Sequence, residues 1–185
     1  MATAMENKKS SSSKTERQTG PTKRLDALFL NALKDIYYAE NEILKALPKL
    51  AKGAESEELT AAFEKHLGET QGQVARLEQV FELLGLPAKG KTCPAIDGIV
   101  EEGDEILEEY IGAPALDAGL VAAAQAVEHY EIARYGALVA WADLLGLTDA
   151  ANLLNATLDE ELATEQALTQ LSEGGINERA LEEAA

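Results

Sequence analysis

Hydrophobic residues recur every three or four positions from residue 25 onward, which is the spacing of one face of an α-helix. Four long stretches and one shorter stretch follow this pattern, and none shows the strict alternation of a half-buried strand. The stretches run from Leu25 to about Lys52, from Ser56 to near Gly85, from Ala95 to about Tyr110, from after Pro114 to Gly146, and from Thr148 to about Gly174. The sequence therefore predicts an all-α protein.

The residues at the ends of these stretches are typical of helix boundaries. Ser56 is suited to an N-cap, and Pro94 is suited to the first position of a helix. Gly53 is suited to the left-handed position that often follows a helix. Pro48 lies inside the first stretch, and we expect it to kink or fray the last turn of that helix.

The lengths of the connections predict how the helices are arranged. Short links join the first long helix to the second and the third to the fourth, so each pair should form an antiparallel hairpin. The connection between the two hairpins is long and carries the shorter helix. This is the ferritin-like form of a four-helix bundle, with one long crossover carrying a short extra helix. An unrelated helical bundle or a solenoid is the alternative, but no repeat of roughly 30–50 residues is visible.

Each long helix carries a polar residue on the face that should be buried. The hydrophobic row of the first helix is interrupted only at Glu40, whereas the row of the second is polar through its middle. A buried charged group is costly unless it is paired, so polar residues at such positions are informative. The charged or ionisable residues on the four rows are Glu40, His66, Glu69, Glu128, Glu131 and Glu161.

These six residues should also lie at a common height in the bundle. Each is thirteen to eighteen residues from its own hairpin turn, marked by Gly53 or Gly146. At about 1.5 Å of rise per residue, each stands roughly 20–27 Å from that turn. The spacing therefore predicts a single polar layer in the middle of the bundle.

Several buried carboxylates in one layer need either protons or cations to neutralise them. A cation is the simpler answer. Oxygen ligands with one imidazole favour iron or manganese, and ferritin-like carboxylate proteins hold two such ions between four helices. We therefore expect two metal ions, iron first and manganese as the alternative, which would permit a reaction with dioxygen or peroxide.

The composition adds a charge argument. The chain has 185 residues, few aromatic side chains and a net charge of -17, so the folded part should repel nucleic acid. Residues 1–24 differ, with six basic and two acidic side chains, a net charge of +4. They lack hydrophobic periodicity and are expected to form a disordered basic tail, either a solubilising extension or an electrostatic tether. The folded domain is expected over residues 25–175, followed by an acidic C-terminal tail over residues 176–185.

The sequence also bounds the location of the protein. Its one cysteine, Cys93, excludes an intramolecular disulfide and any site made of several cysteines. No hydrophobic run approaches the length of a membrane span, and no signal peptide follows the start. A cytoplasmic protein without a membrane partner is expected.

Four segments resemble the signature stretches of the YciE/YciF family of bacterial ferritin-like metal-binding proteins. They are Asp35-Ile36-Tyr37-Tyr38-Ala39-Glu40, His66-Leu67-Gly68-Glu69-Thr70, Ile99-Val100-Glu101-Glu102 and Glu128-His129-Tyr130-Glu131-Ile132-Ala133. The resemblance extends from Leu25 to about Leu171. It implies a dinuclear metal centre in a protein that is usually a homodimer and is associated with stress responses. Mapped onto that pattern, the first-choice carboxylate ligands are Glu40, Glu69, Glu128 and Glu161, followed by His66 and Glu131.

The chain departs from the wider ferritin pattern at one point. A Glu-x-x-His motif is expected on two helices, but Gly72 follows Glu69 at that spacing and Thr164 follows Glu161. Fewer nitrogen ligands imply a different redox potential of the bound metal. The ferroxidase activity of the ferritins is therefore not directly expected of this chain.

Each candidate also has a structural interpretation. Glu40 alone could be a hydrogen-bonding acid, and His66 could be a core histidine with satisfied ring nitrogens. Tyr37, Tyr38 and Tyr135 are more often core residues or hydrogen-bond donors than redox relays. Two functions follow from these alternatives. The first is a metal-dependent protein that oxidises ferrous iron or consumes peroxide; the second is a non-catalytic stress protein with a structural metal and a functional surface or tail.

Overall fold

The structure is a computed structural model that describes residues 24–181, and it contains helices but no strand in that range. The elements are α1 (Leu25–Gly53), α2 (Glu57–Leu83), α3 (Pro94–Glu109), α4 (Leu116–Leu144), α5 (Thr148–Leu171), a π-helical turn η1 (Ser172–Ile176) and α6 (Asn177–Arg179). The predicted all-α class is confirmed for this part of the chain. Nearly all of the predicted basic tail lies outside the described residues. Ile176, the first residue of the predicted acidic tail, is buried.

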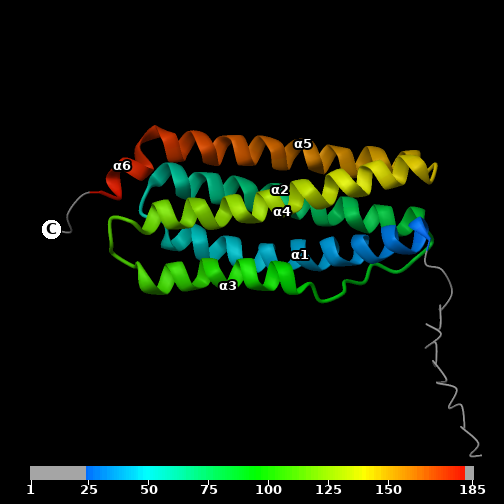
Figure 1. The fold of residues 1–185 in the computed structure, drawn as a ribbon, viewed down its shortest axis with the longest axis horizontal. Coiled ribbons are helices and arrows are strands. Elements are labelled where there is room, and N and C mark those ends of the chain that lie inside the picture. Colours follow the sequence, from blue (N-terminus) through cyan, green and yellow to red (C-terminus); the bar gives the residue numbers. More distant parts are fainter. Residues whose placement is uncertain (1–23, 182–185) are drawn as a thin grey trace, which may run out of the picture.

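The four long helices lie side by side (Figure 1). Around the ring, α1 packs on α2, α2 on α5, α5 on α4 and α4 on α1. Along the chain, α1 and α5 run in one direction and α2 and α4 in the other (Figure 1). Neighbouring helices in the ring are therefore antiparallel, and their hydrophobic faces meet in one core that all four share.

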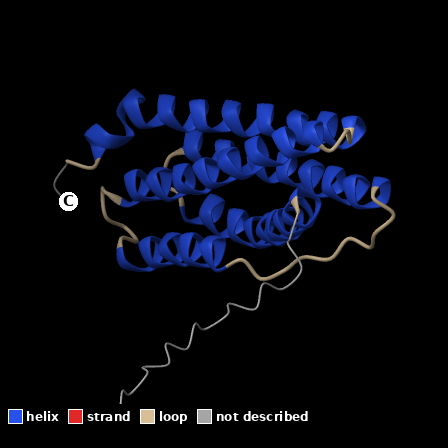
Figure 2. Cartoon of the chain, turned by 45° about the vertical axis from the view of Figure 1, so that its right-hand side comes forward, coloured by secondary structure: helices blue, strands red, loops and turns tan. Residues whose placement is uncertain are grey.

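The shorter helix α3 lies outside this ring and packs on α4 and α1. The segment before it runs along α1 (Figure 2), where the Lys91 N–H donates to the Lys34 carbonyl at 3.0 Å. The Tyr38 hydroxyl then donates to Asp97 in the first turn of α3. The helix α3 lies beside the N-terminal part of α4, where Ile106 approaches Gly119, and beside the C-terminal part of α1, where Leu107 approaches Gly53.

Most predicted helix boundaries are confirmed. Ser56 caps α2 by accepting a hydrogen bond from the Leu59 N–H. Pro94 is the first residue of α3, and Gly146 adopts a φ of 72° in the turn after α4.

The predicted end of α1 is confirmed to within one residue, but the left-handed conformation predicted for Gly53 is wrong. Gly53 is the last helical residue and has no positive φ, and Ala54 ends the helix with extended backbone. A side chain at Gly53 would overlap Leu107, so close packing of α3 explains this glycine. After Pro48 the last turn is helical through Gly53, so the predicted fraying is not seen. The helix α3 packs on α1, and Lys49 in this turn pairs with Asp104 at 2.8 Å.

The carboxylate of Asp117 joins the start of α4 to the turn between α1 and α2. It accepts the backbone N–H groups of Glu55 at 2.9 Å and Ser56 at 2.8 Å, and its side chain is buried. We expect Asp117→Ala to lower the free energy of unfolding by roughly 1–3 kcal/mol, because it removes a charged acceptor from two backbone N–H groups. Urea denaturation followed by circular dichroism measures this loss. Asp143→Ala, at an exposed position of α4, is the matched control and should change stability by no more than about 0.5 kcal/mol.

Among residues 24–181, no helix is both long enough and apolar enough to cross a bilayer.

Candidate metal centre

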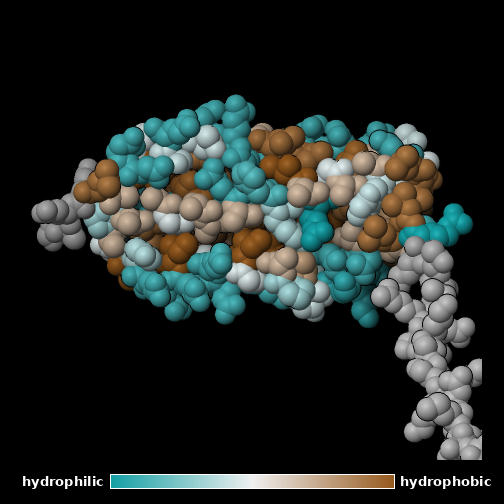
Figure 3. Space-filling view, in the orientation of Figure 1, coloured by the Kyte–Doolittle hydropathy of each residue, from teal (hydrophilic) through white to brown (hydrophobic). Residues whose placement is uncertain are grey.

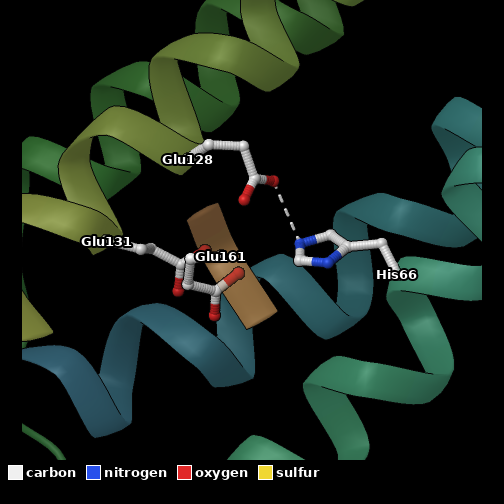
Figure 4. Close-up of side chains that lie close together, drawn as sticks. All are labelled: His66, Glu128, Glu131 and Glu161. Carbon is white, nitrogen blue, oxygen red and sulfur yellow. Dashed lines mark ion pairs between the residues drawn. The ribbon is translucent and has the colours of Figure 1, made fainter. Parts of the chain in front are cut away.

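Four ionisable side chains from three helices meet in the core. They are His66 on α2, Glu128 and Glu131 on α4, and Glu161 on α5. One potential ligand atom from each lies within 4.8 Å of the others, and the side chains point toward one another (Figure 4). None of the four is more than 4% exposed. We call this group the buried cluster.

Helical periodicity explains why these residues share one place. Glu128 and Glu131 are three positions apart, so they lie on the same face of α4. Apolar side chains continue that face above and below them, which places the two carboxylates inside the core. The buried apolar neighbours on α4 are Leu116, Leu120, Val121, Ala124, Tyr135, Leu138 and Ala142.

The cluster leaves many polar atoms without hydrogen-bond partners. Both carboxylate oxygens of Glu131 and of Glu161 are unpartnered, as are one oxygen of Glu128 and both ring nitrogens of His66. His66 Nε2 lies 3.2 Å from Glu128 Oε1, but it forms no directional hydrogen bond there. Each such buried atom costs roughly 1–3 kcal/mol, so a bound cation would relieve a large penalty. Apart from the contact with Glu128, the ring nitrogens of His66 have no hydrogen-bonding partner in the core.

Glu40 on α1 extends the cluster to the fourth long helix. Its side chain is fully buried, and one of its oxygens accepts a hydrogen bond from the Tyr135 hydroxyl. The other oxygen, Oε2, has no partner. Glu40 therefore offers one free oxygen to a cation, and Tyr135 has the hydrogen-bonding role predicted for it.

Glu69 lies at the margin of the site. Its side chain is 25% exposed and pairs with Lys65 on the surface. Its second oxygen is 3.9 Å from His66 Nδ1 and accepts a weak hydrogen bond from Thr164 at 3.5 Å. The fully buried position is taken by the next residue, Thr70. Of the six predicted ligands, Glu69 is the least enclosed.

Burial is the main cause of the raised pKa values of the acids in the site. It raises the pKa of Glu40 to about 7 and that of Glu161 to about 11, with the neighbouring carboxylates adding to the shift of Glu161. The pKa values of Glu128 and Glu131 are also raised, again first by burial. Without a cation, the interior thus favours the protonated forms of these acids.

The imidazole responds in the opposite sense to burial. Burial alone would lower the pKa of His66, but Glu69, Glu128 and Glu40 outweigh it and the net shift is upward. The pKa of Glu69 falls to about 2, first because of its interaction with His66 and then because of Lys65. The protonated, positively charged form of His66 is therefore favoured at this end of the site.

The metal-free protein is expected to lose stability as the pH rises from about 5 to about 8. The folded pKa of Glu40, about 7, lies above its ordinary value of 4.5, so the folded state binds its proton more tightly. The stability from this proton is fully present below pH 4.5 and is lost as the pH rises through 7. Its size is roughly 3 kcal/mol. Urea denaturation in the presence of a chelator measures the pH slope, which Glu40→Gln should reduce; a stability that increases over this range would contradict the shift.

The sequence pattern did not predict a second group of polar residues, which lies beside the cluster. Arg76 donates to Thr157 at 2.9 Å and to both oxygens of Glu160, and Gln73 also donates to Glu160 at 3.2 Å. This network ties α2 to α5 and places a guanidinium near Glu161. The signal in the sequence was the spacing of Gln73 and Arg76, three residues apart on α2.

Tyr37 and Tyr38 have the hydrogen-bonding role predicted for them. Tyr37 donates to Glu78 at 3.0 Å, and Tyr38 donates to Asp97. His129 is exposed and its Nδ1 is 2.8 Å from the Gln125 carbonyl of its own helix, so it does not face the cluster.

Comparison with known proteins identifies the family. A family model described as "Domain of unknown function (DUF892)" matches residues 24–181. The curated protein YciF of Escherichia coli (strain K12) is 44% identical over 159 residues, which are 85% of this chain and 96% of that protein. The chain belongs to the DUF892 family. The sequence-based resemblance to YciE/YciF is confirmed.

Solved structures of similar proteins share the fold. The crystal structure of the E. coli stress protein YciF matches with a TM-score of 0.80 and 44% identity, and it covers 84% of this chain and 99% of that one. YcfI from Rhodopseudomonas palustris, proposed in its own description to be a structural protein, matches with a TM-score of 0.77 and 49% identity over 80% of this chain and 94% of that one. A protein from Xanthomonas campestris, 24% identical with a TM-score of 0.67, covers 84% of this chain and 94% of that one and shares the fold alone.

Proposed function

We propose that this DUF892 protein is a ferritin-like stress protein that binds two iron or manganese ions and uses them to oxidise ferrous iron with dioxygen or peroxide. The observation that carries the proposal is the buried cluster, in which His66 and three glutamates converge with most of their polar atoms lacking hydrogen-bond partners. A site of this composition suits a hard or borderline cation better than any neutral ligand. Glu40 and Glu69 flank the cluster and bring the donor set to six side chains, as the family resemblance implies.

The donor set also supports the choice of metal. Carboxylates predominate and there is one imidazole, a mixture typical of iron and manganese sites in helical bundles. A ferrous ion supplies one electron, so two ions reduce one dioxygen, with two protons, to hydrogen peroxide. Two ferrous ions likewise reduce one hydrogen peroxide, with two protons, to two waters. The protein's own contribution is to hold the acids together and to exclude bulk water from them.

The test begins with elemental analysis of the purified protein. Anaerobic addition of ferrous iron to the metal-free protein, followed by stopped-flow mixing with dioxygen or peroxide, should give oxidation at least tenfold faster than in a Glu40→Ala, Glu128→Ala double variant. Both substitutions remove carboxylates whose free oxygens face the site. Equal rates in the two proteins would contradict the proposed activity.

The second function is a non-catalytic stress protein in which a metal ion locks the helices together. Two observations favour it: the absence of Glu-x-x-His at Glu69 and Glu161, and the description of the R. palustris relative as structural. Metal binding with no oxidation by either oxidant would support this function. As the family resemblance implies, we propose a homodimer in both cases.

A further inference from the structure

An apolar cavity of about 30 Å³ lies inside the molecule next to the buried cluster. A volume of roughly 10–15 Å³ holds one water-sized molecule, so this cavity has room for about two. Hydrophobic side chains from α1, α2, α4 and α5 form its inner wall, including Ile43, Leu47, Phe63, Ala124 and Leu168. Nearly all of that wall offers no hydrogen bond.

Small residues keep this space open. Ala46 on α1, Gly103 on α3 and Ala124 on α4 all line it. A methyl group added at Gly103 would still lie 3.8 Å from Ala123 Cβ and 4.0 Å from Leu50 Cδ2, which are ordinary contacts. The space therefore exists because side chains are short at these positions.

Two polar residues with atoms that lack hydrogen-bond partners mark the inner end of the cavity. His66 and Glu128 both line it, and they are only 4% and 1% exposed. Both ring nitrogens of His66 and Oε2 of Glu128 lack hydrogen-bond partners. The cavity thus leads directly to two members of the buried cluster.

The outer end lies between α3 and α4. Four of the lining residues there, Ile99, Val100, Ala123 and Val127, are only half-buried. Figure 3 shows hydrophobic surface along the line between these two helices. The apolar lining therefore continues from the interior toward the surface.

We propose that this cavity binds dioxygen and leads it from the surface between α3 and α4 to the buried cluster. A dioxygen molecule gives up no hydrogen bonds on entering an apolar cavity, whereas hydrogen peroxide and water each give up several. The inference rests on the proposed function and assigns the cavity as the route of dioxygen, the less polar of the two proposed oxidants. It gives the small residues that line the cavity the role of keeping the path of dioxygen to the buried cluster open.

Xenon tests the cavity without any metal chemistry, because apolar cavities bind this gas. In metal-free protein, ¹²⁹Xe NMR or xenon-pressurised crystals should show xenon at the cavity. Ala124→Leu should abolish that binding, whereas Ala122→Leu, at an exposed position two residues earlier on α4, should preserve it. Absence of xenon from the unmodified protein, or its persistence in Ala124→Leu, would overturn the proposal.

The rates of ferrous oxidation test the route. Ala124→Leu should slow oxidation by dioxygen at least tenfold, while metal affinity and the rate with peroxide stay within about twofold. Ala122→Leu should leave both rates unchanged.

If xenon is excluded but the dioxygen rate is unaffected, the route is wrong although the proposed function stands. If neither oxidant reacts with the unmodified protein, the proposed function fails and so does the route. Should circular dichroism show that Ala124→Leu is unfolded, Ala46→Val on the facing wall takes its place in both experiments.

Discussion

Ferrous or manganous ions added to the metal-free protein are expected to raise its Tm by roughly 8–16 °C. At a free metal concentration about a thousandfold above Kd, a ligand that binds only the folded state contributes about 4 kcal/mol. For a domain of this size each kcal/mol corresponds to roughly 2–4 °C. The stabilisation arises because the cation supplies partners to the free oxygens of Glu131 and Glu161 and to the ring nitrogens of His66.

Scanning calorimetry with and without a chelator measures this shift. A Glu128→Gln, Glu161→Gln double variant keeps the side-chain volumes but removes two anionic ligands, so its Tm should respond to metal by less than about 2 °C. An equal response in the double variant would place the bound metal elsewhere, and no response in the unmodified protein would contradict the metal centre.

Glu161→Leu is expected to stabilise the metal-free protein at about pH 8 by roughly 1–4 kcal/mol while abolishing metal binding. Glu161 is fully buried, neither of its oxygens has a partner, and its pKa is raised to about 11. Keeping this acid protonated at pH 8, or leaving it charged in the core, costs free energy that an apolar side chain does not require. Replacing buried ionic groups by hydrophobic ones of similar volume often stabilises by this amount.

Urea denaturation in the presence of a chelator checks the sign. Glu160→Leu, one residue earlier on the same helix, is the matched comparison, because Glu160 pairs with Arg76 and its loss leaves that guanidinium without its carboxylate. The same substitution should therefore destabilise at position 160 and stabilise at position 161. A loss of stability in Glu161→Leu would mean that the carboxylate is accommodated without a cation.

The helix boundaries show which features of the fold the local sequence can predict. Ser56, Pro94 and Gly146 act within a few residues of themselves, and all three were predicted from the sequence. Gly53 was misread because its reason lies in Leu107, more than fifty residues away on α3. A glycine required by packing looks the same in a sequence as one required by a turn.

The residues of the candidate metal centre were likewise predicted only in part from the sequence. The rows of the four long helices, and the common distance of their polar residues from the turns, could be read directly from the sequence. They brought His66, Glu128, Glu131 and Glu161 to one layer, as the structure has them.

What the sequence by itself determined is the set of helices, the face that each one buries and the height at which its acids lie, because helical periodicity and rise are local properties. The tertiary structure decided the rest. It placed Thr70 rather than Glu69 fully inside, gave Glu40 the Tyr135 hydroxyl as a partner, and left the apolar cavity beside Glu128. These features depend on how neighbouring helices rotate and approach each other, and that geometry is fixed only when all the side chains of the core pack together.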